Sequence, residues 1–126
     1  MLEAARRTLK RLTPEEAATE MGMGTKLIDT RTLEQRLADG VIPGAIEVGL
    51  NFLEWRCDPT SPDRDARLGE ITHDSRLIIL CDQGYSSSLA AARLQALGLH
   101  KTTDVDGGFK AWRAGGLPIE PYREDN

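Results

Sequence analysis

The stretch LIILCDQGYSSSLAAARL, residues 77–94, constrains the fold more than any other part of the chain. Its first four residues are apolar and β-branched in the middle, which is typical of a short strand buried on both faces. From Ser88 onward the spacing is helical, because alanine and leucine recur on one face from Ala90 to Leu97. The sequence therefore predicts a strand, a tight turn that carries Cys81, and then a helix.

The rest of the chain alternates strands with helices. The motifs Thr-Pro-Glu-Glu at 13–16 and Thr-x-x-Gln at 32–35 predict two capped helix starts. Strands are expected at 26–30, 45–48, 76–80 and 101–107, and helices at 14–21, 33–39, 51–56, 88–97 and 108–115, with one long loop at 57–70. Such alternation indicates an α/β fold with a parallel sheet and helices on both faces.

Length and composition limit the class of protein. The chain has 126 residues, which suits one domain, and its net charge of -4 argues against a nucleic-acid partner. It has no apolar run of membrane-spanning length, so no membrane partner is expected. Two cysteines do not form a disulfide framework, which makes a reducing, cytoplasmic location the default. The basic segment 1–11 is expected to be a solvated N-terminal extension.

The turn after the strand at 76–80 is a chemically active position for a thiol. Ligands of α/β sheets bind beyond the carboxyl ends of the strands, where Cys81 is expected to lie. The N–H groups and dipole of the following helix favour a thiolate there. Gly84 lets the backbone curl around the sulfur, and three serines add hydroxyl donors. A buried structural cysteine is the alternative, but its position on the turn favours the reactive thiol.

Four motifs in order resemble the rhodanese family of sulfurtransferases. They are LIDTR at 27–31, IPGAIEV at 42–48, CDQGYSS at 81–87 and GGFKAWRAGGLPI at 107–119. The resemblance implies a single rhodanese domain at 12–120, with a tail at 121–126. It implies a rhodanese-like fold, in which a five-stranded parallel sheet is flanked by helices on both faces.

The resemblance also implies a chemistry and a set of site residues. Cys81 would be the nucleophile, carrying a persulfide between a sulfur donor such as thiosulfate and a thiol or cyanide acceptor. No metal or organic cofactor is implied. The backbone amides of the active-site loop would stabilise the thiolate and the persulfide, namely those of Asp82, Gln83, Gly84, Tyr85, Ser86 and Ser87.

The loop departs from many family members in its charge. Ser86 holds the place of a frequent arginine, and Asp82 adds a negative charge. These differences weaken the attraction for thiosulfate, so a persulfide on another protein is an alternative donor. Arg56 is hypothesised to supply the missing cation, and a solvated arginine is the equally weighted alternative. Cys57 is expected to be a free thiol rather than a partner that resolves the persulfide as a disulfide.

Two other functions can be weighed from the residues. Cysteine phosphatases need an arginine six residues after the nucleophile, where this chain has Ser87, so the phosphate would lose its bidentate clamp. A non-enzymatic module that relays sulfur or binds a protein stays open, because its sequence would look the same. Asp29 and Arg31 are expected to form a structural ion pair. His73 and His100 are expected to be solvated.

Overall fold

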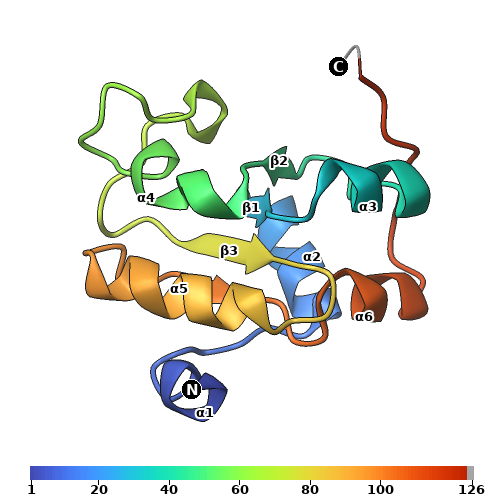
Figure 1. The fold of residues 1–126 in the computed structure, drawn as a ribbon, viewed down its shortest axis with the longest axis horizontal. Helices are drawn as coiled ribbons and strands as arrows, with labels where there is room; N and C mark the ends of the chain where they lie inside the picture. The colour runs from blue at the N-terminus through green and yellow to red at the C-terminus, as the bar shows by residue number, and fades with distance from the viewer. Residues whose placement is uncertain (125–126) are drawn as a thin grey trace.

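The structure is a computed structural model that describes residues 1–124. Its centre is a parallel sheet in the order β2-β1-β3-β4 (Figure 1). The strands are β1 (Lys26–Asp29), β2 (Ile46–Glu47), β3 (Leu77–Leu80) and β4 (Thr103–Asp104). β1 and β3 pair along their whole length in the middle of the sheet, so the carboxyl ends of these two strands lie side by side.

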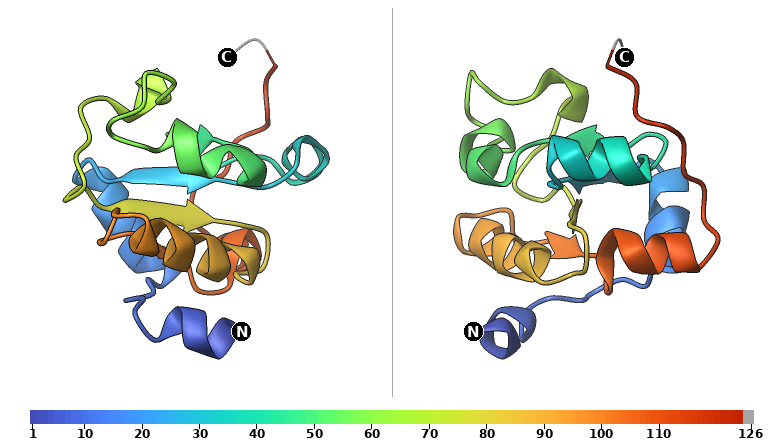
Figure 2. Two further views of the ribbon diagram at one scale, coloured as in Figure 1. Left: turned by 60° about the vertical axis from the view of Figure 1, so that its left-hand side comes forward. Right: turned by 45° about the vertical axis from the view of Figure 1, so that its right-hand side comes forward.

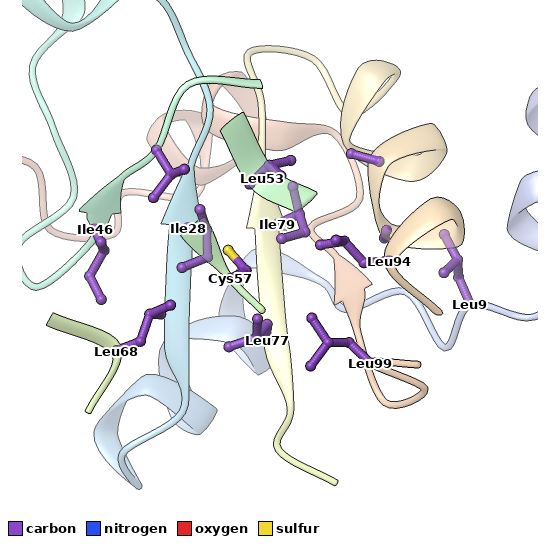
Figure 3. Close-up of a cluster of buried hydrophobic side chains, with 13 residues drawn as sticks. Leu9, Ile28, Ile46, Leu53, Cys57, Leu68, Leu77, Ile79, Leu94 and Leu99 are labelled. Atoms are coloured by element: carbon purple, nitrogen blue, oxygen red, sulfur yellow. The ribbon is translucent and has the colours of Figure 1, made fainter. Parts of the chain in front are cut away.

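Side chains of the central strands alternate between two hydrophobic clusters. Leu77 and Ile79 of β3 point into one cluster, and Ile78 and Leu80 point into the other. Figure 3 shows the first cluster, with Cys57 among its leucine and isoleucine side chains. Successive residues of a strand face opposite sides. Both sides are covered here, which explains the unbroken apolar run at 77–80.

Helices supply the other half of each cluster. The first cluster includes residues of α4 (Leu53–Arg56) and α5 (Ser86–Ala96), and the second includes residues of α2 (Pro14–Gly22) and α6 (Gly108–Ala114). The two views of Figure 2 show the sheet between these layers. The remaining helical segments are α1 (Leu2–Arg6), α3 (Leu33–Asp39), η1 (Leu50–Phe52) and η2 (Ala66–Leu68). The predicted α/β fold with helices on both faces is therefore confirmed.

Both predicted capping boxes are present. The Glu16 N–H donates to Thr13 Oγ1 at 3.1 Å, and the Thr13 N–H donates to Glu16 Oε1 at 2.9 Å. Thr32 and Gln35 make the same pair of bonds at the start of α3. These side chains satisfy N–H groups that a helix start leaves free, so α2 and α3 begin where the sequence predicts.

The prediction of five strands is wrong, since the described chain forms a four-stranded sheet. In place of a fifth strand there is a single parallel bridge between Leu12 and Val105. The Leu12 N–H donates to the Asp104 carbonyl at 3.0 Å, and the Asp106 N–H donates to the Leu12 carbonyl at 2.8 Å. A longer strand has no room, because Thr13 already caps α2.

Two further expectations need correction. Helix α5 begins at Ser86 rather than near Ser88, so the turn after Cys81 is tighter than predicted. The segment 1–11 is not simply solvated, because α1 packs on α5 and Leu9 is buried in the first hydrophobic cluster. Across residues 1–124, no helix is long and apolar enough to cross a membrane.

Candidate active site around Cys81

Cys81 follows β3 directly and lies at the carboxyl edge of the sheet. Its side chain lines an open pocket of about 830 Å³, which also receives residues from the segments after β1 and β2. The residue is only 6% exposed, so the thiol is reached through this pocket. Four partly exposed apolar side chains also line the pocket, namely Leu33, Leu50, Phe52 and Tyr85. The site therefore joins a recessed thiol to an apolar rim.

Backbone N–H groups converge on the Cys81 sulfur. The Gly84 N–H donates to Sγ at 3.1 Å, and the Ser87 N–H donates to it at 3.4 Å. Of the six amides that the resemblance implies, these two contact the sulfur in the described structure. The amides of Asp82, Gln83, Tyr85 and Ser86 make no hydrogen bond to Sγ within residues 1–124. The loop thus forms a small nest of donors around one sulfur atom.

The pKa of Cys81 is set by two opposing effects. Burial raises the pKa of the thiol, because a thiolate is poorly solvated there. Hydrogen-bond donors of Ser87, Ser86 and Gly84 lower it, and of these the N–H groups of Ser87 and Gly84 lie at hydrogen-bond distance from Sγ. The donors outweigh burial, so the pKa of Cys81 lies below the ordinary value for a thiol. A lowered pKa increases the fraction of nucleophilic thiolate at neutral pH.

A buried carboxylate lies behind the loop and competes for one of these donors. Asp104 is fully buried and accepts hydrogen bonds at 2.8 Å from the hydroxyls of both Ser87 and Ser88. Ser87 has a single hydroxyl proton, so this hydroxyl cannot serve Asp104 and the sulfur together. The N–H groups of Gly84 and Ser87 are therefore the donors committed to the sulfur of Cys81.

The start of α6 holds the loop from the other side. The Phe109 N–H donates to the Cys81 carbonyl at 2.9 Å, and the Lys110 N–H donates to the Asp82 carbonyl at 3.0 Å. Gly108 has φ +61°, and a Cβ added there would lie 2.5 Å from the Cys81 carbonyl oxygen. The Gly-Gly pair at 107–108 therefore lets α6 approach the backbone of the nucleophile.

Arg56 does not lie at this pocket, which corrects the hypothesis drawn from the sequence. Its Nη2 lies 3.4 Å from Asp65 Oδ2, and its Nη1 donates to the Asp63 carbonyl at 2.7 Å. Arg56 is absent from the residues that line the pocket around Cys81. The long loop at 57–70 turns back towards α4, and its residues Asp63 and Asp65 bind the Arg56 guanidinium.

Arg36 is the cation that sequence reasoning missed. It lines the Cys81 pocket from α3, and its Nη1 donates to the Arg31 carbonyl. Its Nε is buried and has no hydrogen-bond partner among residues 1–124. The Tyr122 ring lies 5.5 Å from the guanidinium carbon. A basic residue on the helix after the first strand is the signal that could have revealed Arg36, since this helix starts at the carboxyl edge of the sheet.

The other charged residues of the pocket already have partners. Arg31 pairs with Asp29 at 2.9 Å, as the sequence predicts, and both side chains are fully buried. Glu47 lies 3.0 Å from Arg67, and Asp82 lies 3.7 Å from Lys110. Within the described residues, Arg36 makes no ion pair. Arg36 is therefore the pocket cation best able to take an anionic ligand.

The remaining candidates lie away from this chemistry. Cys57 is a free, fully buried thiol, and burial raises its pKa to about 12. His100 is exposed and pairs with Asp74 at 2.7 Å on the surface. In residues 1–124, no three His, Cys, Asp or Glu side chains are grouped so as to hold a metal ion.

The fold and motifs match a known family. The model of the rhodanese-like domain matches residues 13–115, which is most of the chain. The chain belongs to the rhodanese family. A sulfurtransferase of Allochromatium vinosum is 31% identical over 93 residues, covering 74% of this chain and 76% of the relative. The thiosulfate sulfurtransferase GlpE of Ectopseudomonas mendocina is 32% identical over 108 residues, covering 83% and 85% of the two chains.

Two solved structures share the same architecture. A Rhodopseudomonas palustris protein of unknown function, described as a possible tyrosine phosphatase, has a TM-score of 0.82 and 33% identity, and the match covers 94% of this chain and 90% of that one. The thiosulfate sulfurtransferase of Pseudomonas aeruginosa has a TM-score of 0.70 and 28% identity, and the match covers 94% of this chain and 21% of that one. The family match and the relatives named as sulfurtransferases support sulfurtransferase activity in general for this rhodanese.

Proposed function

We propose that this rhodanese is a sulfurtransferase that carries sulfane sulfur as a persulfide on Cys81. The observation that carries the proposal is the position of the Cys81 sulfur, recessed in an open pocket and bound by two backbone N–H donors. Such donors favour a thiolate, which is the form of cysteine that attacks sulfur. The free thiol and the absence of a disulfide between the two cysteines suit a reducing compartment, and we propose the cytoplasm.

The reaction has two half-steps. The Cys81 thiolate attacks the outer sulfur of thiosulfate, the sulfur–sulfur bond of thiosulfate breaks, and sulfite leaves with the electron pair. An acceptor thiolate or cyanide then attacks the outer sulfur of the Cys81 persulfide, which releases the Cys81 thiolate unchanged. Covalent catalysis of this kind divides one transfer into two easier steps. The N–H groups of Gly84 and Ser87 stabilise the negative charge on Sγ whenever the thiolate forms.

Arg36 is proposed to bind the anionic end of the donor. Arg36 lines the same pocket as Cys81 and makes no ion pair within the described chain. A guanidinium suits the oxygens of a sulfonate-like group, since it offers several donors in a fixed plane. Asp82 in the same pocket opposes a dianion, so we also propose a persulfide on another protein as a donor.

Phosphatase activity is the second function to test, because one structural relative is described in those terms. The position six residues after Cys81 is Ser87. Its hydroxyl donates a hydrogen bond to Asp104, and it offers no positive charge to the pocket. A phosphate dianion would lack a bidentate clamp from the loop. We therefore expect no hydrolysis of p-nitrophenyl phosphate above the level of Cys81→Ser.

The direct test is the intact mass of the protein after incubation with thiosulfate. The wild type should gain one sulfur atom, and Cys81→Ser should gain none. Added cyanide should remove the sulfur, which separates a persulfide from two added oxygen atoms of nearly equal mass. No gain from thiosulfate, followed by no gain from a persulfide-loaded protein donor, would contradict the proposal and favour a non-enzymatic binding module.

A further inference from the structure

We infer that the N-terminal segment, residues 1–11, is a positioning element of the active site that holds the Cys81 loop through Arg6 and Arg11. The inference rests on the proposed role of Cys81 as a thiolate nucleophile. The segment lies outside residues 13–115, which the family model matches. The family match therefore says nothing about the role of this segment.

The contacts converge on the Gly84 carbonyl. Arg6 Nη2 donates to this oxygen at 2.8 Å, and Arg11 Nη2 donates to it at 3.0 Å. Arg6 Nε also donates to the Ser88 hydroxyl at 3.0 Å, which in turn lies 3.3 Å from the Gly84 carbonyl. Two guanidinium groups on one backbone carbonyl form a charge-assisted clamp. The carbonyls of Cys81 and Asp82, by contrast, are held by the backbone of α6.

The clamp holds Gly84, the residue that supplies one of the two N–H donors to the sulfur. A trans peptide is planar, so its N–H points opposite to its carbonyl. The clamped peptide joins Gly84 to Tyr85, so the Tyr85 N–H points away from the two arginines. The same residue, Gly84, donates its own N–H to the Cys81 sulfur at 3.1 Å. The N-terminal segment therefore fixes the orientation of the loop on which the nest of donors depends.

Arg11 has a second effect, which is electrostatic. Its Nε lies 2.9 Å from Asp104 Oδ1 and its Nη2 lies 3.2 Å from Oδ2, so it balances the buried carboxylate behind the sulfur. Burial lowers the pKa of Arg11, but its bonding and attraction to Asp104 outweigh this, and the Cys81 charge acts in the same direction. Without Arg11, an unbalanced negative charge at Asp104 would oppose ionisation of Cys81.

The other charged groups around Cys81 do not depend on this segment. On the pocket side these are Arg31, Arg36, Glu47 and Asp82, and on the α6 side Lys110 pairs with Asp82. On the far side of Arg11, the exposed Asp106 lies 3.1 Å from Nη1. A substitution at Arg6 or Arg11 therefore changes the donor nest and the balance at Asp104 while the pocket charges stay in place.

The test measures how fast iodoacetamide alkylates Cys81 as a function of pH in the full chain. Arg11→Gln should raise the midpoint by about one pH unit, which lowers the rate at neutral pH by up to about tenfold. Arg6→Gln should raise it by less, because this variant keeps the pair between Arg11 and Asp104. Arg11→Lys keeps the positive charge and should therefore bring the midpoint back close to that of the wild type. Arg7→Gln is the matched control, since Arg7 is exposed on the same segment, and its midpoint should equal that of the wild type.

The proposal is overturned if Arg6→Gln and Arg11→Gln, shown to be folded by circular dichroism, keep the midpoint of Arg7→Gln. If Arg11→Gln does not fold, Arg6→Gln decides alone. Cys81→Ser gives the background from Cys57, which is fully buried. Alkylation needs no sulfur donor or acceptor. The midpoint can therefore be measured and interpreted even if the protein does not transfer sulfur.

Discussion

A single methyl group added at Gly108 should displace the backbone of the active site. A Cβ at Gly108 would lie 2.5 Å from the Cys81 carbonyl oxygen and 2.8 Å from the carbonyl carbon and oxygen of Asp82. These are backbone atoms, so no side-chain rotation can relieve the contact. Gly108→Ala must therefore move either the start of α6 or the backbone of the nucleophile.

The cost can be worked from two parts. A side chain at φ +61° costs roughly 1 to 2 kcal/mol, and an overpacked contact in a buried site costs roughly 1 to 3 kcal/mol. Together they lower the free energy of unfolding by about 2 to 5 kcal/mol. For a domain of this size, about 4 °C of Tm per kcal/mol gives a fall of about 8 to 20 °C.

The control is Gly116→Ala. Gly116 has φ +73°, but a Cβ added there would meet nothing within 4 Å. Only the backbone cost applies, so thermal denaturation followed by circular dichroism should show a fall of about 4 to 8 °C. Equal losses in the two variants would refute the reasoning, because they would show that the Cys81 loop moves away freely from the added methyl group.

Three other predictions follow from the site and the core. Arg36→Ala should raise the KM for thiosulfate about tenfold or more, and Arg56→Ala should leave it nearly unchanged; steady-state kinetics with equal KM values in the two variants would contradict the role of Arg36. Cys57 should resist alkylation at pH 8 in the folded protein and react only in denaturant, as peptide mapping would show, since burial raises its pKa to about 12. Hydrogen bonding to Arg67 opposes burial and lowers the pKa of Asp65 to about 2, so Asp65 stabilises the fold above pH 4 and loses this effect as the pH falls towards 2. Asp65→Asn should therefore cost about 1 to 2 kcal/mol at pH 7, and urea denaturation at pH 2 should show almost no difference from the wild type.

Local patterns predicted the parts of the fold that depend on neighbouring residues. The caps at Thr13 and Thr32 were predictable because each bonds to a residue three positions later. The strand, turn and helix around Cys81 were predictable because a change of hydrophobic period marks them. The number of strands was not predictable, because the start of α2 decides how far the chain can pair beside β4.

The charges of the site depend on distant contacts and were harder to predict. Arg56 follows the second strand in a suitable place, yet Asp65 in the following loop binds it away from Cys81. Arg36 has no sequence motif, and its importance appears only when α3 is placed beside the pocket. Segment 1–11 is predicted to be a solvated extension because it is short and basic. Its two arginines contact the Gly84 carbonyl and Asp104, and two side chains leave no periodic signal in the sequence.

The bonds of segment 1–11 also bear on the order in which the protein is assembled. Arg6 and the Gly84 carbonyl are separated by 78 residues, and Arg11 and Asp104 by 93. During synthesis, segment 1–11 must therefore wait for β4 before Arg11 finds its carboxylate. Contacts between such distant residues form late, because closing long loops costs entropy. A nascent chain would complete the contacts behind Cys81 only after Asp104 had left the ribosome, so the surrounding fold forms before the proposed reactive site is complete.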